Sequence, residues 1–195
     1  MVYTISREIG IDAGHRVPTH GSKCKNLHGH RYTIQAICES EDLHEEGEQK
    51  DMTLDFGFLK QEMMDVIDLC CDHGVMLWSG DPLLEVLIPN EEQCNKVADF
   101  VHQNGWCDVS REWTLSGIGK LYVISVIPTA EALAKHWFER LEKRVAERSN
   151  NLAWLAKVQV WETPNCWAAY EKALEPSVLR ELLEEERRGE EGLRR

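Results

Sequence analysis

Residues 12–30 read DAGHRVPTHGSKCKNLHGH. The stretch carries four histidines, of which His15, His28 and His30 have the spacing of a zinc site, and a cysteine, Cys24, four residues before His28. Side chains two residues apart on a strand point to the same face of a sheet, so His28 and His30 can act together. Three neutral imidazoles can hold a tetrahedral zinc ion with the fourth position open, as in catalytic rather than structural sites. The stretch therefore predicts a metal beside a thiol that acts as nucleophile or base, although each histidine taken singly is more often a structural residue.

Hydrophobic periodicity on both sides of this stretch predicts an α+β domain. Weak alternation over 3–11 and 31–38 predicts one strand before it and one after it. Apolar residues at helical spacing predict a helix over 57–71, and Thr129 is placed as the N-cap of another helix that runs to about Ser149. The other expected segments are a polar connection over 39–50, irregular chain over 72–89, a helix over 91–103, and strands over 121–127, 158–162 and 167–170.

Composition excludes several classes of protein. The chain has 195 residues, 43% hydrophobic and 29% charged, and no apolar run near the roughly 20 residues that cross a bilayer. The N-terminal residues lack the apolar core of a signal peptide, and seven cysteines show no regular framework. We therefore expect a cytoplasmic protein with reduced thiols and no membrane partner.

The net charge of −12 argues against a nucleic-acid partner. Much of it lies in two acidic stretches, 39–51 and 181–191. The stretch 19–31 has the opposite character, with Lys23, Lys25 and Arg31 and no carboxylate. A small anionic substrate at a locally basic site therefore remains compatible with the acidic chain.

Two further motifs are candidates for the same site. Asp72 precedes His73, and a carboxylate beside an imidazole can orient it and raise its basicity, although a histidine that favourably ends a helix is the alternative. Glu162 and Thr163 follow a predicted strand. A buried glutamate there can accept two parallel hydrogen bonds from an amino-pyrimidinone edge, whereas most strand-end glutamates are merely solvated.

Taken together and in this order, these motifs resemble the 6-pyruvoyltetrahydropterin synthase / 6-carboxytetrahydropterin synthase family. The resemblance implies the tunnelling fold, an antiparallel four-stranded sheet with two helices on one face. It also implies a homo-oligomer, a barrel-shaped hexamer with active sites between neighbouring subunits. The matching segments span residues 12–163 and read DAGHR, CKNLHGH, LDFGFLK, DH, PTAE and WET.

Carried over residue by residue, the resemblance assigns a role to each motif. His15, His28 and His30 would bind Zn²⁺, which would hold the side-chain hydroxyls of a pterin triphosphate substrate and lower their pKa. Cys24 would abstract a proton. Asp72 and His73 would be its acid–base partners, contributed by an adjacent subunit. Glu162, with Thr163 beside it, would anchor the pterin ring.

Three residues separate Cys24 from His28, the gap typical of the bacterial 6-carboxy enzymes of the family. The resemblance therefore favours conversion of 7,8-dihydroneopterin triphosphate with loss of triphosphate and acetaldehyde, on the queuosine and 7-deazaguanine route. Three alternatives stay open. They are a 6-pyruvoyltetrahydropterin synthase, a non-catalytic zinc- or pterin-binding homologue, and a structural zinc site with Cys24 as fourth ligand.

The chain departs from the family pattern in two places. Residues 74–78, which follow the Asp-His pair, differ from the usual loop, and the segment that leads to Pro128 is longer than in compact members. We expect a single synthase domain over 1–175 with an insertion at about 81–120, followed by a polar helical or disordered tail over 176–195. No counterpart can be assigned to that tail.

Overall fold

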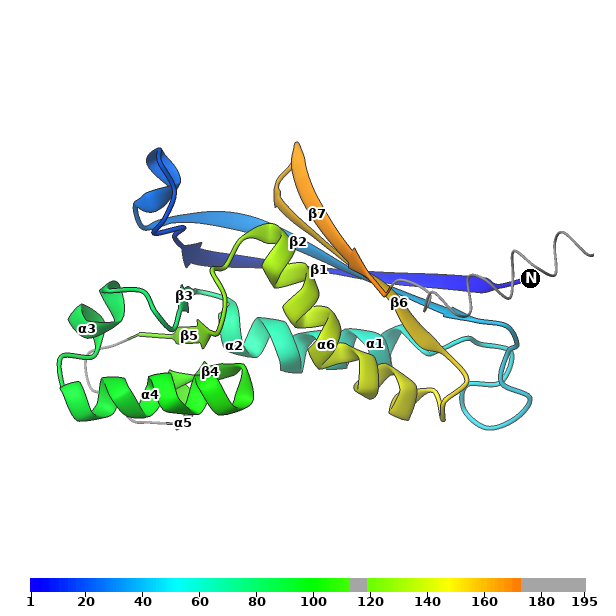
Figure 1. Ribbon diagram of the computed structural model, residues 1–195. Helices are drawn as coiled ribbons and strands as arrows, with labels where there is room; N and C mark the ends of the chain where they lie inside the picture. Colours follow the sequence, from blue (N-terminus) through cyan, green and yellow to red (C-terminus); the bar gives the residue numbers. More distant parts are fainter. Residues whose placement is uncertain (113–118, 173–195) are drawn as a thin grey trace, which may run out of the picture.

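A computed structural model of the chain describes residues 1–112 and 119–172. The tail predicted over 176–195 lies outside the described residues. Within them, seven strands form one sheet in the order β4-β5-β3-β1-β2-β6-β7 (Figure 1). The strands are β1 (Tyr3–His15), β2 (His28–Ser40), β3 (Gly74–Trp78), β4 (Trp106–Asp108), β5 (Leu121–Ile124), β6 (Trp154–Thr163) and β7 (Cys166–Glu171).

The two longest strands, β1 and β2, pair antiparallel along their whole length. The register runs from Tyr3 opposite Ser40 to His15 opposite His28. Alternate residues of each strand, such as Ile11 and Ile34, are fully buried, and those between them face away from the core. Both strands were predicted, but each reaches the histidines, so the three imidazoles lie on strands and not in the connection.

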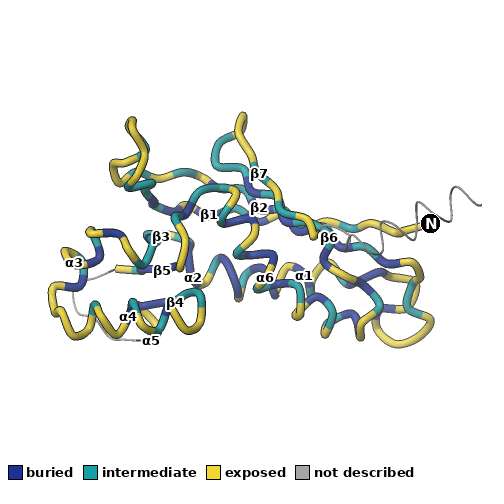
Figure 2. Tube along the Cα trace, viewed as in Figure 1, coloured by how far each residue is buried: buried dark blue, intermediate teal, exposed yellow. Residues whose placement is uncertain are grey.

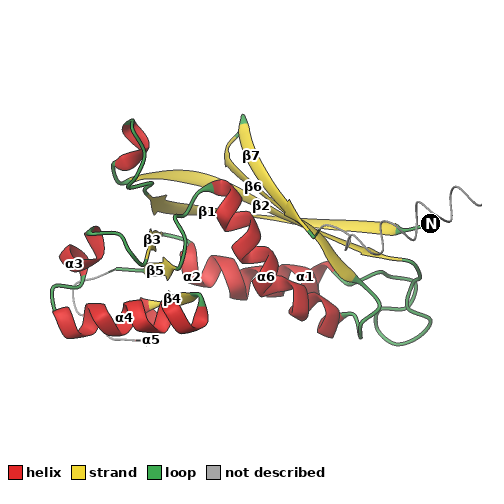
Figure 3. Ribbon diagram, in the orientation of Figure 1, coloured by secondary structure: helices red, strands yellow, loops and turns green. Residues whose placement is uncertain are grey.

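Helices cover one face of the antiparallel part of the sheet (Figure 3). The carboxylate of Asp55 accepts hydrogen bonds from the N–H groups of Gly57 and Phe58 and so starts α1. The hydroxyl of Thr129 does the same for Ala132 in α6. The predicted long helices are thus confirmed. The helical elements are η1 (Lys23–Lys25), α1 (Phe56–Met63), η2 (Met64–Asp68), α2 (Leu69–Cys71), α3 (Leu83–Leu87), α4 (Glu91–Asn104), α5 (Val109–Glu112) and α6 (Ala130–Arg148).

The sheet has more strands than the four predicted. β1, β2, β6 and β7 form the expected antiparallel unit, but β3 and β5 add parallel to β1, and β4 pairs antiparallel with β5. The prediction of irregular chain over 72–89 was therefore wrong at 74–78, which forms β3, and at 83–87, which forms α3. A strand that pairs parallel with distant segments is a short apolar run without alternation. Hydrophobic periodicity therefore does not identify it.

The added segment, residues 74–112 and 119–124, contains β3, α3, α4, β4, α5 and β5. It encloses a second, smaller core, which includes Leu77, Val97, Val101 and Val123. Figure 2 shows the buried positions of this segment on the sides that face the sheet, with the outer turns of α4 exposed. The main core, under α1, η2, α2 and α6, includes Ile11, Ile34, Trp137 and Leu141.

A half-buried cation, the guanidinium of Arg140, connects α6 to the added strands. One guanidinium nitrogen of Arg140 on α6 donates to the backbone oxygen of Val66 at 2.9 Å and contacts the hydroxyl oxygen of Tyr122 on β5 at 2.6 Å. The same guanidinium lies 3.7 Å from the ring centre of Trp106 on β4, a cation–π contact. The Tyr122 hydroxyl also lies 2.7 Å from Nε2 of His136. These contacts hold the added strands against α6.

His136 makes folding stability sensitive to acid. Burial, with a smaller contribution from the charge of Arg140, lowers the pKa of His136 to about 3. In the unfolded chain the imidazole of His136 takes up a proton near pH 6.5, whereas in the folded protein it stays neutral. The free energy of unfolding therefore falls as the pH decreases below that value. Between pH 7 and pH 5, we expect the free energy of unfolding to fall by about 2 kcal/mol more in the wild type than in His136→Gln. Urea denaturation at fixed chain concentration measures this, and an equal loss in both proteins would contradict it.

Candidate active site

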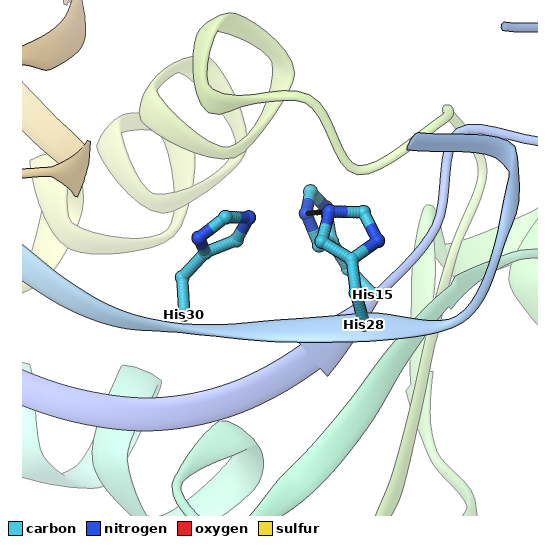
Figure 4. A group of neighbouring side chains, drawn as sticks. All are labelled: His15, His28 and His30. Carbon is cyan, nitrogen blue, oxygen red and sulfur yellow. Dashed lines mark hydrogen bonds between the residues drawn. The ribbon is translucent and has the colours of Figure 1, made fainter. Parts of the chain in front are cut away.

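Three histidines converge at the end of the β1–β2 pair. His15 is the last residue of β1, and His28 and His30 begin β2, on the face of the ribbon that carries the core. One nitrogen from each ring can be chosen so that the three atoms lie within 4.8 Å of one another (Figure 4). Below them Tyr32 packs edge-on against the rings of His15 and His30. The group could hold a metal ion.

Hydrogen bonds to backbone carbonyls fix the tautomers of two of the rings. Nδ1 of His15 lies 2.8 Å from the carbonyl oxygen of Pro128, and Nδ1 of His28 lies 2.8 Å from that of Asn26. A carbonyl oxygen can only accept, so each Nδ1 carries the hydrogen and each neutral ring has a bare Nε2. These two Nε2 atoms face each other at 3.1 Å. Two lone pairs at that distance repel unless a cation lies between them, so the donor set fits a metal ion.

The protein environment also favours the neutral form of His15 and His30. Burial lowers the pKa of His15, although the Pro128 carbonyl and the charge of Glu162 act in the opposite direction. Burial likewise lowers the pKa of His30 against the effect of Glu162. A metal ion competes with protons for imidazole nitrogen, so lowered pKa values favour metal binding at neutral pH.

Cys24 and Glu162 meet His15 in one pocket of about 260 Å³. Cys24 lies in η1, within the connection between β1 and β2. Glu162 lies near the end of β6, and its Oε1 is 3.2 Å from Nε2 of His15 and 3.8 Å from Nε2 of His30. Cys24 does not belong to the group of neighbouring metal-ligand atoms found among the described residues. The pocket thus places a thiol and a carboxylate beside the imidazoles.

Residues at the starts of α6 and β7 also line this pocket, and sequence analysis assigned no role to those of α6. The first turn of α6 contributes Thr129, Ala130 and Glu131, and the start of β7 contributes Cys166 and Trp167. The PTAE segment signals a helix start, but only the fold brings that start over the histidines. Thr163 does not line the pocket; its hydroxyl accepts from the backbone N–H of Asn165 at 3.4 Å.

Asp72 and His73 form a pair, but outside this pocket. Oδ2 of Asp72 lies 2.7 Å from Nδ1 of His73, and its Oδ1 accepts from the backbone N–H of Asp12 at 2.8 Å. Although its partial burial acts to raise the pKa of Asp72, these hydrogen bonds lower it. The His73 side chain is 77% exposed. The pair lies at the edge of β1, next to the ion pair of Asp12 and Arg31. Asp12 and Arg31 alternate with buried residues on their strands, so their side chains lie on the face opposite to the three histidines.

None of the described helices combines the length and the apolar character that a membrane crossing requires.

Comparison with known proteins gives a consistent result. The family model described as 6-pyruvoyl tetrahydropterin synthase matches residues 4–173. The 6-carboxy-5,6,7,8-tetrahydropterin synthase of Rickettsia bellii is 28% identical over 162 residues, which cover 83% of this chain and 95% of that protein.

Solved structures share the fold. An uncharacterized protein from Wolinella succinogenes, 24% identical, has a TM-score of 0.68 over 89% of this chain and 99% of its own. The 6-pyruvoyl tetrahydropterin synthase of Caenorhabditis elegans, 22% identical, has a TM-score of 0.54 over 89% and 97%. The predicted α+β tunnelling fold is confirmed, with the added strands as a difference in detail.

The geometry of the histidines leads to a prediction on metal binding. We expect the protein to bind one Zn²⁺ per chain and His28→Ala to weaken binding at least about 100-fold, because two ligands remain where three converged. Competition with a chromophoric chelator measures the affinity. His102→Ala, which removes an exposed imidazole from α4, is the matched control. Equal affinity in the His28 variant and the control would contradict the prediction.

Proposed function

The chain belongs to the 6-pyruvoyl tetrahydropterin synthase family, and we propose that it is a zinc-dependent 6-carboxy-5,6,7,8-tetrahydropterin synthase. It would convert 7,8-dihydroneopterin triphosphate with loss of triphosphate and acetaldehyde, in the cytoplasm, on the route to queuosine or other 7-deazaguanines. The names of curated relatives support the reaction. The observation that carries the proposal is the single pocket in which His15, Cys24 and Glu162 meet.

In this proposal the protein contributes binding, orientation and proton transfer. Glu162 accepts two hydrogen bonds from the amino-pyrimidinone edge of the pterin, with Thr163 beside it. His15, His28 and His30 hold Zn²⁺, which when bound supplies Lewis-acid stabilisation of negative charge on substrate oxygen. Cys24 acts as the base that removes a proton from the substrate side chain, and it lies within the same pocket as Glu162.

Asp72 and His73 would serve as acid–base partners of Cys24 in a neighbouring subunit. The exposure of His73 at the edge of β1, with both residues outside the pocket of their own chain, supports this assignment. So does the sheet, because among the described residues β1 pairs with β3 only over Ala13–His15, and β7 pairs only with β6. Long unpaired edges are normally covered. We propose that they pair between copies in a homo-oligomer, a hexamer, with active sites at subunit interfaces.

Product analysis tests the reaction. We expect zinc-loaded protein to release triphosphate and acetaldehyde from 7,8-dihydroneopterin triphosphate, with 6-carboxy-5,6,7,8-tetrahydropterin identified by mass spectrometry. Cys24→Ala should lower the rate at least about 100-fold, because the step loses its base, while the zinc content stays at one per chain. Cys94→Ala, at a thiol in the added segment, is the matched control.

Other products would redirect the assignment. A 6-pyruvoyl product without acetaldehyde would identify a 6-pyruvoyltetrahydropterin synthase. Absence of turnover in zinc-loaded protein that still binds the pterin would identify a non-catalytic homologue. Loss of zinc in Cys24→Ala would instead indicate a structural site in which the thiol is a ligand.

Mixed oligomers test the sharing of residues between subunits. Cys24→Ala and His73→Ala chains should each be inactive, but co-refolded in equal amounts they should recover about a quarter of the wild-type activity, because random assembly pairs an intact thiol with an intact dyad at that frequency. Steady-state rates of the mixture measure this. Sites built within one chain would leave the mixture as inactive as its components.

A further inference from the structure

The connection between β1 and β2, residues 16–27, carries Cys24 and is held mainly by its own backbone. The N–H of Val17 donates to the carbonyl of Cys24 at 2.9 Å, and that of His20 donates to the carbonyl of Val17 at 2.9 Å. Lys23 and Lys25, on either side of the thiol, are exposed. In Figure 1 the connection is a loop that extends past the end of the sheet, above α3 in this view. Its internal hydrogen bonds fix its shape but not its position on the protein.

One ion pair joins this connection to the added segment. Nε of Arg16 lies 3.0 Å from Oδ2 of Asp81, whose side chain is completely buried. Within the described ranges it is the only ion pair between residues 16–27 and the remainder of the chain. A buried carboxylate that loses its cation is left uncompensated, so the pair constrains both of its partners.

Asp81 is itself rigidly held. Its Oδ1 accepts from the N–H of Leu83 at 2.8 Å, and its N–H donates to the carbonyl of Trp78 at the end of β3. β3 in turn pairs with the end of β1, where Val75 and Met76 lie opposite Gly14 and His15. Asp81 therefore has a fixed place relative to the strand that carries His15.

Arg16 occupies the matching place in the chain. It directly follows His15 and directly precedes Val17. The N–H of Val17 donates to the carbonyl of Cys24, and Val17 also lines the pocket. The ion pair of Arg16 thus constrains the first residue of the connection, where a small backbone rotation moves the Cys24 thiol relative to the imidazoles.

We propose that Arg16 and Asp81 are a positioning pair, through which the added segment holds the 16–27 connection, and Cys24 with it, in place over the pocket. The expected effect on enzyme activity rests on the function proposed above, whereas the expected effect on the position of the 16–27 connection does not. This assigns a task to the start of the added segment, which contributes no residue to the pocket.

Limited proteolysis of the assembled, zinc-loaded protein tests the proposal. Asp81→Asn keeps an oxygen that can accept from Leu83 but removes the charge. We expect trypsin to cleave after Lys23 and Lys25 about fivefold or more faster in Asp81→Asn and Arg16→Gln, because the connection opens locally. Arg16→Lys, which keeps the cation, should stay within about twofold of the wild type. Glu92→Gln, which breaks the exposed Glu92–Lys96 pair on α4, is the control.

Cleavage after Lys50, in an exposed loop elsewhere, reports on the rest of the molecule. A cleavage rate after Lys23 and Lys25 that is unchanged in Asp81→Asn, or that rises equally after Lys50, would overturn the proposal. If Asp81→Asn does not fold, the cleavage rates of Arg16→Gln and Arg16→Lys after Lys23 and Lys25 decide instead. Equal rates in these two variants would overturn the proposal.

Kinetics separate this proposal from the proposed function. In Asp81→Asn we expect kcat to fall about tenfold with KM and zinc content nearly unchanged, because only the base is displaced. A wild type without turnover would contradict the proposed function and leave the proteolysis result to decide on the pair.

Discussion

The pairing of β1 with β2 is the constraint on which the site depends. Its register puts His15 opposite His28 and Ala13 opposite His30. A shift of one residue would turn the imidazoles of one strand to the opposite face and expose the buried side chains that alternate with its outward residues. The apolar residues that fix the core therefore also fix the geometry of the three histidines, and the same strand pairing serves stability and ligand arrangement.

Backbone groups outside this strand pair also orient the residues of the site. Pro128 ends the approach to α6 and presents its carbonyl to His15, while Thr129 starts the helix one residue later. Helix α6 is in turn packed on β6, which brings Glu162 to the pocket. The tautomer of one imidazole thus depends on where a helix begins, more than one hundred residues away in the chain.

Local sequence contained much of this fold and site, but not all of it. The alternation around 31–38, the apolar spacing over 57–71 and the cap at Thr129 are local signals, and the strands and helices they predict are present. The spacing of His28 and His30 likewise indicated one face of a strand. The parallel neighbours β3 and β5, the facing of Arg16 and Asp81, and the approach of Glu131 to the pocket all depend on contacts between distant segments, which no periodicity encodes.

The position of Asp72 and His73 has a physical consequence for assembly. Hydrogen bonds to Asp12 fix the pair at the edge of β1, while the pocket opens on the face that carries α6. Neither Asp72 nor His73 lines the pocket that contains Cys24 in its own chain. If these residues act with Cys24 as proposed, the dyad comes from another copy. Edges of β1 and β7 that pair with no other strand among the described residues are where such a copy can dock without breaking any existing strand pairing.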